Sequence, residues 1–300
     1  MGGLFESLLK KPFPLVMGIL NVTPDSFSDG NSLETVDLAV QRAETLVRDG
    51  ALIIDVGGES TRPGAAPVSE SIELQRVIPV VRSLASKLPH TLISVDTSKA
   101  EVARVALDEG AGLINDVRAL GDPWMSAVLA DAGVPVILMH KQGDPRTMQR
   151  APHYQNVVAD LRDFFVERVA FARSRGISRN NLLLDPGFGF GKTTEHNVEI
   201  LCRLKEFLGL EFPLVVGLSR KSFIGRVLGG EDTPLDPSER EDGSLAANLW
   251  AVAQGAKIVR VHNVKKTVQA LTLWERVGAI KPDDKNPTPF LKEKQQPETV

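Results

Sequence analysis

Polar side chains follow eight short apolar segments of this 300-residue chain, each at or just beyond the point where a segment ends. Their types suit the binding of a small polar molecule, because carboxylates accept hydrogen bonds and asparagine both donates and accepts them. They are Asn21, Asp55, Asp96, Asn115, His140, Asp185, Ser219 and His262. Buried polar groups without partners are costly, so such a set predicts a ligand, mutual pairing or water. Each residue alone has a second reading, since Asp, Asn and Ser also cap helices and open turns.

The apolar segments themselves are rich in β-branched residues and alternate with stretches of helical spacing. They cover residues 14–20, 51–56, 91–95, 112–115, 135–139, 181–184, 213–217 and 257–261, and helical spacing is clearest over 35–50, 71–88, 99–110 and 154–176. Continuous apolar runs predict strands buried on both faces, as in parallel sheets covered by helices. Eight such units predict an α/β protein with a single-domain (β/α)8 TIM barrel over residues 1–280, whose active face is built from the loops after the strands.

Two segments interrupt the alternation. Residues 226–242 are rich in Gly, Pro and acidic residues, which predicts a surface excursion before a helix that begins near Gly243. Residues 281–300 carry four prolines and many charges but little to bury, which predicts a flexible C-terminal tail.

Composition excludes several classes of protein. A net charge of −3 argues against a broad nucleic-acid surface, so any basic cluster should be local and aimed at a small anion. The single cysteine, Cys202, excludes an internal disulfide and removes the case for thiolate zinc sites. No apolar run approaches the roughly 18 residues of a membrane span, and the first residues lack a signal-like segment. We therefore expect a cytoplasmic protein without a membrane partner.

Generic phosphate motifs fail on inspection. The segment 187–193, GFGFGKT, looks superficially like a P-loop, but the required first glycine would fall at Pro186 and the segment follows the sixth strand rather than the first. No G-x-G-x-x-G follows the first strand either. A doubly wound dinucleotide fold is therefore disfavoured, although its β/α alternation would look similar.

Six longer motifs occur in series between Leu15 and Val264. They are MGILNVTPDSFSDG, DVGGESTRPGA, SVDTSKAEVARVAL, LDPGFGFGKT, GLSRKSFIG and VRVHNV. In this order they closely resemble the dihydropteroate synthase family. The resemblance implies a transferase of folate biosynthesis that condenses 6-hydroxymethyl-7,8-dihydropterin diphosphate with 4-aminobenzoate, giving 7,8-dihydropteroate and pyrophosphate. It also implies a homodimer formed through barrel helices.

A pterin pocket follows from the resemblance. Asp96, Asn115 and Asp185 match the residues that hold the amino and ring-nitrogen groups, and Lys221 matches the one that reaches the carbonyl side. The chemistry suits these types, because carboxylates accept from the donors of an aminopyrimidinone and lysine supplies a cation to its acceptor edge. Met139 and Phe190 match residues that flank the flat ring, although core filling is the default reading for each taken alone.

The diphosphate requires cationic partners, and the resemblance assigns it Arg62, Arg260, His262 and Asn21, with Asn21 as a magnesium contact. Arginine matches phosphate oxygens bidentately, while Mg²⁺ keeps several waters and few protein ligands. Asp55 could orient the arginines, and an ordinary ion pair is the second reading for each arginine. The expected catalytic groups are Arg62, Lys221, Arg260 and His262, which would act electrostatically and without a covalent nucleophile. Arg260→Ala should reduce turnover far more than fold stability.

The resemblance also implies an aminobenzoate site made by loops after the first two strands. Phe27, Thr61 and Pro63 would close it, and Ser222 would place the carboxylate at a helix N-terminus. Asn31 and Asn263 depart from the family pattern without removing a proposed ligand. Two alternatives remain open: a pterin-binding methyl-transfer barrel, whose substrate has no diphosphate, and a catalytically silent paralogue that acts as a binding protein.

Overall fold

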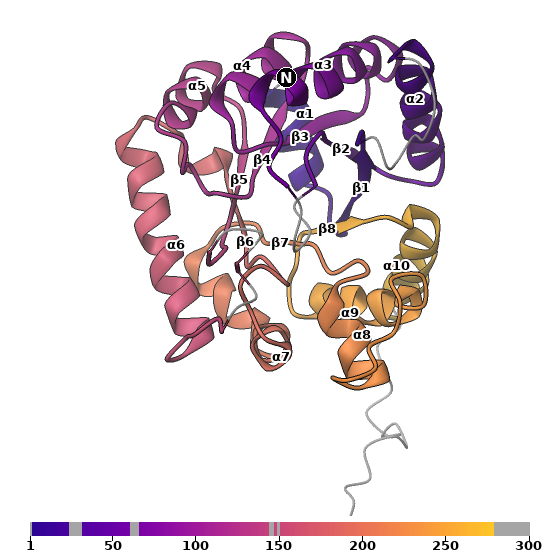
Figure 1. The fold of residues 1–300 in the computed structure, drawn as a ribbon, viewed down its shortest axis with the longest axis vertical. Helices are drawn as coiled ribbons and strands as arrows, with labels where there is room; N and C mark the ends of the chain where they lie inside the picture. Colours follow the sequence, from indigo (N-terminus) through magenta and orange to yellow (C-terminus); the bar gives the residue numbers. More distant parts are fainter. Residues whose placement is uncertain (1, 24–31, 61–65, 144–146, 149–150, 279–300) are drawn as a thin grey trace, which may run out of the picture.

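The computed structural model describes residues 2–23, 32–60, 66–143, 147–148 and 151–278 (Figure 1). Its eight strands are parallel and hydrogen-bonded in the order β6-β5-β4-β3-β2-β1-β8-β7, and a bridge between Leu184 and Leu214 joins the two ends of that order. The strands are β1 (Leu15–Asn21), β2 (Ile53–Gly57), β3 (Leu92–Asp96), β4 (Leu113–Asp116), β5 (Val136–Met139), β6 (Leu182–Asp185), β7 (Val215–Val216) and β8 (Ile258–Val261). The predicted (β/α)8 barrel is therefore confirmed.

Helices surround the barrel and begin where local sequence favours it. They are α1 (Gly2–Leu9), α2 (Ser32–Arg48), α3 (Glu70–Lys87), α4 (Ala100–Asp108), α5 (Met125–Ala132), α6 (Val157–Ser174), α7 (Thr194–Cys202), α8 (Ser222–Gly229), α9 (Glu241–Ala253) and α10 (Val264–Gly278). The Asn156 side chain caps α6 by accepting from the amide of Ala159 at 3.1 Å. Thr193 and His196 form a reciprocal capping box at the start of α7.

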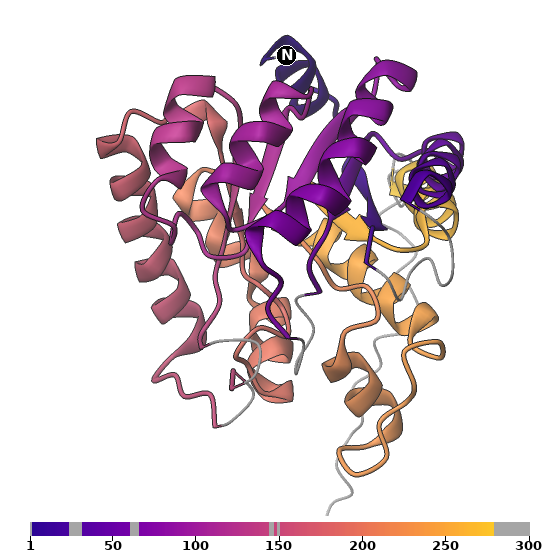
Figure 2. The same cartoon turned by 45° about the horizontal axis from the view of Figure 1, so that its top comes forward.

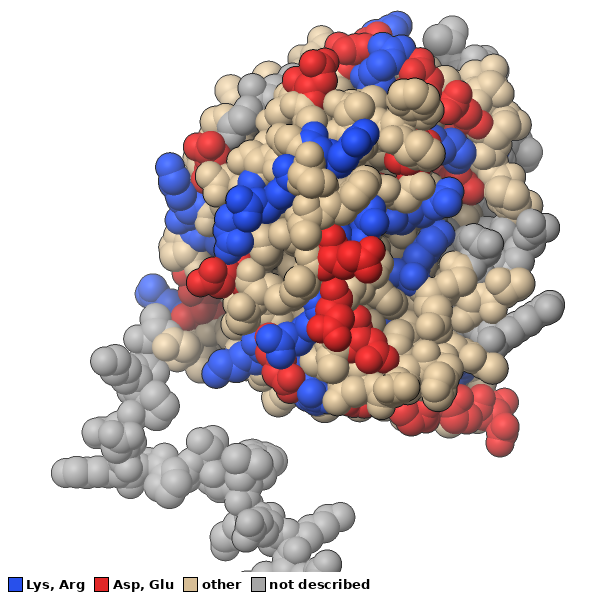
Figure 3. Space-filling model, turned by 90° about the vertical axis from the view of Figure 1, so that its left-hand side faces the viewer, with Lys and Arg blue, Asp and Glu red and all other residues tan. Residues whose placement is uncertain are grey.

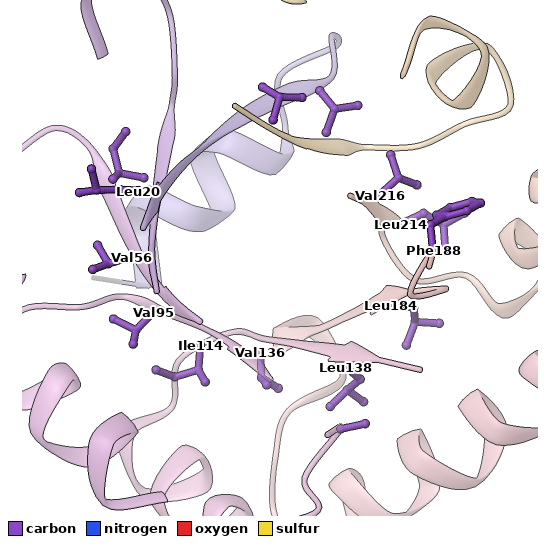
Figure 4. Packing of buried hydrophobic residues seen from close by; sticks show 14 of the residues in the cluster. Leu20, Val56, Val95, Ile114, Val136, Leu138, Leu184, Phe188, Leu214 and Val216 are labelled. Carbon is purple, nitrogen blue, oxygen red and sulfur yellow. The ribbon is translucent and has the colours of Figure 1, made fainter. Parts of the chain in front are cut away.

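Side chains alternate between the two faces of each strand, which separates the core into two layers. Leu20, Val56, Val95 and Ile114 belong to the larger cluster and point away from the barrel axis toward the helices, as do the other residues labelled in Figure 4. The alternate positions fill the interior with a second cluster: Leu15, Met17, Ile53, Leu92, Leu113, Ile137, Leu183, Val215 and Ile258.

The same alternation places the polar residues. Along each strand, the side chain two positions after an inward-pointing apolar residue also points inward. Asp55 follows Ile53 in this way, Ser94 and Asp96 follow Leu92, Asn115 follows Leu113, Asp185 follows Leu183, and Arg260 follows Ile258. The interior of the barrel is therefore apolar toward the amino ends of the strands and polar at their carboxyl ends.

Helix α1, which the sequence analysis did not predict, lies against the other end of the barrel (Figure 2). Phe5 and Leu8 are almost fully buried and belong to the interior apolar cluster. The Lys257 ammonium donates to the carbonyl oxygens of Lys11 and Phe13 at 2.5 and 3.3 Å, which fixes the connection from α1 to β1. The amino-terminal end of the barrel is thus covered by apolar packing.

The predicted excursion 226–242 is shorter than expected, because α8 continues to Gly229. The remaining loop is ordered by its own hydrogen bonds. The amide of Leu235 donates to the carbonyl of Gly225 at 3.1 Å, and Arg240 Nε donates to the carbonyl of Leu235 at 2.8 Å. The predicted tail, 281–300, lies outside the described residues.

The exterior bears on two expectations, about membrane spans and about surface charge. Among the described residues, no helix combines the length and the apolar character that crossing a membrane requires. Figure 3, which views the side on the left of Figure 1, shows acidic and basic side chains interspersed rather than one broad basic area.

Candidate active site

A pocket opens at the carboxyl end of the barrel, where the polar interior residues meet. The space between its walls is about 370 Å³ when the open mouth is included. It is lined by Asp96, Asn115, Val117, Met139, Asp185, Gly187, Phe188, Phe190, Gly217, Lys221 and Arg260. All six predicted pterin contacts and one predicted diphosphate contact therefore share one cavity.

Arg260 joins two carboxylates at one side of this pocket. Its Nε donates to Asp55 Oδ2 at 2.6 Å, and one terminal nitrogen donates to Asp96 Oδ2 at 2.8 Å. Asp55 is completely buried and also accepts from Ser94 Oγ at 2.6 Å and from the Asn115 amide at 3.2 Å. The direct contact between Asp55 and Arg260 therefore agrees with the orienting role suggested for Asp55.

Burial changes the pKa values of the charged groups in this cluster. Burial raises the pKa of Asp96 to about 7, and the neighbouring Arg260 charge offsets only part of that cost. Burial also opposes the charge of Arg260, but Asp55 and Asp96 more than compensate and raise the pKa of its guanidinium. Arg260 therefore stays cationic, while Asp96 is the group whose proton occupancy responds near neutral pH.

Asn115 leaves one acceptor for a ligand. Its side-chain amide donates to Asp55, whereas its Oδ1 atom is buried without a hydrogen-bond partner. An unpaired buried acceptor in a pocket wall calls for a donor from a ligand or from water. An aromatic amine or ring N–H would meet that requirement.

Another part of the pocket wall is cationic and aromatic. Lys221 Nζ lies 4.1 Å from the centroid of the Phe190 ring. Burial first, and then the charge of Arg260, lower the pKa of Lys221 to about 8. Phe190 also packs with Val117, Met139 and Met148 in a small apolar cluster beside the pocket. A flat ring could therefore lie between apolar side chains while its edge meets charged groups.

Asp185 is positioned by the turn that follows β6. Its Oδ1 atom accepts from the amide of Gly187 at 2.7 Å, and burial raises the pKa of its carboxyl group. Gly187 has a φ of +69°, and a Cβ there would overlap the carbonyl oxygen of His140. Only glycine fits this turn.

Three further predicted residues lie at the same mouth but outside the lining of the pocket. Asn21 ends β1, and its Oδ1 atom borders the space beside Gly57 that Asp96 also borders. His262 follows β8, and its Nδ1 atom lies 2.9 Å from Ser219 Oγ. Ser222 is the first residue of α8, in agreement with its predicted place at a helix N-terminus.

Four predicted residues, Phe27, Thr61, Arg62 and Pro63, lie outside the described residues. The two ends of the loop that carries the last three are nevertheless described. Glu59 Oε1 accepts from the amide of Val68 at 3.2 Å, and Lys99 bridges Glu59 and Glu73. The contacts of Arg62 with a diphosphate stay a prediction.

Sequence reasoning missed some lining residues and one buried pair. Val117, Gly187, Phe188 and Gly217 line the pocket, and the only signal for them was that each lies at a predicted strand end or within a few positions after one. Lys192 belongs to the failed P-loop motif and to the motif LDPGFGFGKT, but no role was predicted for it. Its ammonium points at carbonyl oxygens and at His140, an arrangement that suits no anion.

The family model described as pterin binding enzyme matches residues 17–262, so the chain belongs to the pterin-binding enzyme family. Among curated relatives, the dihydropteroate synthase of Escherichia coli K12 is 52% identical over 268 residues, covering 89% of this chain and 93% of that protein. Within the family, the chain is therefore a member of the dihydropteroate synthases.

Solved structures agree with this membership. A structure of Xanthomonas albilineans dihydropteroate synthase with 4-aminobenzoic acid matches with a TM-score of 0.83 and 49% identity, covering 90% of this chain and 94% of that one. Another, of the Xanthomonas albilineans enzyme in complex with 7,8-dihydropteroate, matches with a TM-score of 0.80 and 46% identity, covering 90% and 95%. The motif resemblance is confirmed at the level of the family.

Proposed function

We propose that the chain condenses 6-hydroxymethyl-7,8-dihydropterin diphosphate with 4-aminobenzoate and releases pyrophosphate. The observation that carries this proposal is the arrangement of Asp96, Asn115, Asp185 and Lys221 around one cavity that Arg260 borders. The first three offer acceptors to the donor edge of a pterin, and Lys221 offers a donor to its carbonyl. The related structures with 4-aminobenzoic acid and with 7,8-dihydropteroate support the same substrate classes.

In the proposed reaction, the bond between the exocyclic methylene carbon of the pterin and the diphosphate oxygen breaks, and its electron pair leaves with pyrophosphate. The amine nitrogen of 4-aminobenzoate then bonds to that carbon and loses one proton. Arg260, together with Arg62 and His262, would stabilise the charge that develops on the leaving group. Asp96 and Asp185 would favour positive charge on the pterin.

A magnesium ion is part of this proposal. Gly57 has no side chain to fill the space between the Asn21 amide oxygen and Asp96, and oxygen donors of this kind suit Mg²⁺. Within the described ranges, no group of three or more His, Cys, Asp or Glu residues could hold a metal by itself. Asn21 would therefore hold an ion whose other ligands are water and diphosphate, and whose charge would help neutralise the leaving group.

The two alternatives differ from this proposal in ways that can be measured. A methyl-transfer barrel would use the pterin contacts but would have no diphosphate to place beside Arg260. A silent paralogue would bind pterin and release nothing. We further propose a homodimer and a cytoplasmic location, both by analogy with the family.

Pyrophosphate release from the pterin diphosphate tests the proposal, measured with and without 4-aminobenzoate and with and without Mg²⁺. Release that requires all three components, with formation of 7,8-dihydropteroate, is the expected result. Pterin binding without release would favour the silent paralogue. Release that does not depend on 4-aminobenzoate would overturn the proposed acceptor.

A further inference from the structure

Lys192, in the turn between β6 and α7, is a buried lysine with no part in the proposed reaction. It is only 1% exposed and does not line the pocket. Its Nζ atom lies 3.0 Å from His140 Nδ1, 3.0 Å from the carbonyl oxygen of Gly187 and 3.1 Å from that of Phe190. Burying a lysine is costly, so a lysine kept here in the interior needs an explanation in its contacts.

These contacts use the full donor capacity of an ammonium group. Lysine carries three N–H donors when protonated and no acceptor. Three acceptors lie within 3.1 Å of Nζ, and the carbonyl oxygen of His140 is a fourth, more distant one at 3.5 Å. His140 can accept at Nδ1 only as a neutral ring whose hydrogen is on Nε2. Burial, followed by the charge of Lys192, lowers the pKa of His140 to about 2, so the ring is neutral.

The three acceptors belong to two different loops that border the pocket. His140 directly follows Met139 at the end of β5, whereas Gly187 and Phe190 belong to the turn after β6. The two loops are in contact, because a Cβ at Gly187 would overlap the His140 carbonyl and one at Gly191 would overlap that of Gln142. The Lys192 side chain therefore connects the backbone of one loop to the ring of the other.

Two of the three residues that Lys192 contacts line the pterin pocket, and the third directly follows a lining residue. Gly187 and Phe190 line it, and so does Met139, the neighbour of His140. Gly187 also donates its amide to Asp185, and the Phe190 ring lies under Lys221. A shift of the Gly187–Phe190 turn would thus move an apolar wall, one carboxylate and one cation together.

We propose that Lys192 is a positioning residue that sets the pterin-contacting turn 187–190 against the end of β5 through its bonds to His140, Gly187 and Phe190. This inference rests on the proposed function, since it assumes that the pocket holds a pterin. Lys192 touches no substrate and acts through the groups that do.

Lys192→Met tests this role, because methionine keeps much of the volume and removes all three donors. The matched control is Lys257→Met, which removes a lysine that also donates to two backbone carbonyls, but at the opposite end of the barrel. For Lys192→Met we expect KM for the pterin diphosphate to rise at least about tenfold, since small misplacements of binding groups are costly. KM for 4-aminobenzoate should stay within about twofold. Lys257→Met should change neither constant.

Hydrogen exchange gives a second readout on the same variants, independent of turnover. The backbone amides of residues 187–191 should exchange faster in Lys192→Met than in wild type. In Lys257→Met their exchange rates should equal those of wild type. Equal loss of stability in both variants with an unchanged pterin KM would mean that Lys192 is merely structural, and would overturn the proposal.

Substitutions at His140 keep the proposal testable if Lys192→Met does not fold. Asparagine can place an acceptor oxygen near the position of Nδ1, whereas leucine cannot. His140→Asn should therefore keep a pterin KM close to that of wild type, and His140→Leu should raise it. Equal constants in the two variants would contradict the bond to Lys192. Absence of pyrophosphate release from wild type would instead refute the proposed function.

Discussion

At the scale of single residues, Arg260 connects the stability of the barrel to the chemistry of its mouth. It neutralises Asp55, which is completely buried, and Asp96, which lines the pocket. Sequence reasoning treated Arg260 as a ligand of the diphosphate and expected its loss to affect turnover much more than stability. The contacts indicate both effects, because a buried carboxylate that loses its partner carries an uncompensated charge.

Arg260→Ala is expected to reduce the free energy of unfolding by about 3–5 kcal/mol at pH 8, where Asp96 is mostly ionised, as well as to lower kcat/KM. Urea unfolding and pyrophosphate release measure the two effects. Arg82→Ala removes the exposed ion pair with Glu109 and should change neither measurably. A fully stable Arg260→Ala protein would show that Asp55 and Asp96 do not depend on this cation.

Lys221 should make pterin binding depend on pH. Its folded pKa of about 8 lies below the ordinary value of 10.5, so the folded protein binds fewer protons than the unfolded chain between these values. The contribution of Lys221 to stability therefore rises with pH across that window, while the cation offered to a ligand is lost as pH passes about 8.

Calorimetric titration with a dihydropterin checks this prediction by comparing wild type with Lys221→Met. The difference in affinity between the two should be largest near neutral pH and should shrink above pH about 8. A difference that stays constant with pH would show that the charge of Lys221 does not contribute to binding.

At the scale of the elements, strands were more predictable than the contacts between loops. The apolar runs were visible because both faces of each strand are buried, and the period of two then places Asp96, Asn115 and Asp185 inward at one end. Helix α1 was missed because Phe5 and Leu8 have partners only once eight distant strands are assembled. The pairing of Lys192 with His140 depends on a left-handed glycine turn, so neither residue alone indicated it.

Gly187→Ala should disrupt the turn after β6 far more than an ordinary glycine substitution does. The added methyl group would overlap the His140 carbonyl, and the positive φ would be strained as well. Gly133→Ala is a matched control, because Gly133 has a φ of +63° with nothing within 4 Å of an added Cβ. It should cost only about 1 kcal/mol.

Thermal unfolding and pterin affinity together check the comparison. Gly187→Ala should lose several times more stability than the control and should bind pterin more weakly. If the two variants behaved alike, close approach of the two loops would not be what restricts position 187 to glycine.

At the scale of the whole molecule, the described surface of α9 and α10 exposes large apolar side chains. Trp250 is 49% exposed, Leu273 is 65% exposed and Trp274 is 48% exposed. The two helices pack together, as Figure 1 also shows. Exposed large apolar side chains are common at interfaces between subunits, which makes the exposed sides of α9 and α10 our choice for the proposed homodimer.

Leu273→Glu should therefore shift the protein toward the monomer in analytical ultracentrifugation. Val166→Glu, which changes an apolar residue of α6 that is 57% exposed, serves as the control and should leave the oligomeric state unchanged. A wild-type protein that sediments as a monomer at all concentrations would contradict the proposed dimer itself.

Phe5 and Leu8 close one end of the barrel with apolar packing, and this affects how substrates enter and products leave. With that end closed by packed side chains, pterin diphosphate and 4-aminobenzoate have to arrive through the same opening by which pyrophosphate and the joined product depart. Both products must therefore leave through this opening before the next pair of substrates can bind. Retained pyrophosphate would then compete directly with incoming pterin diphosphate.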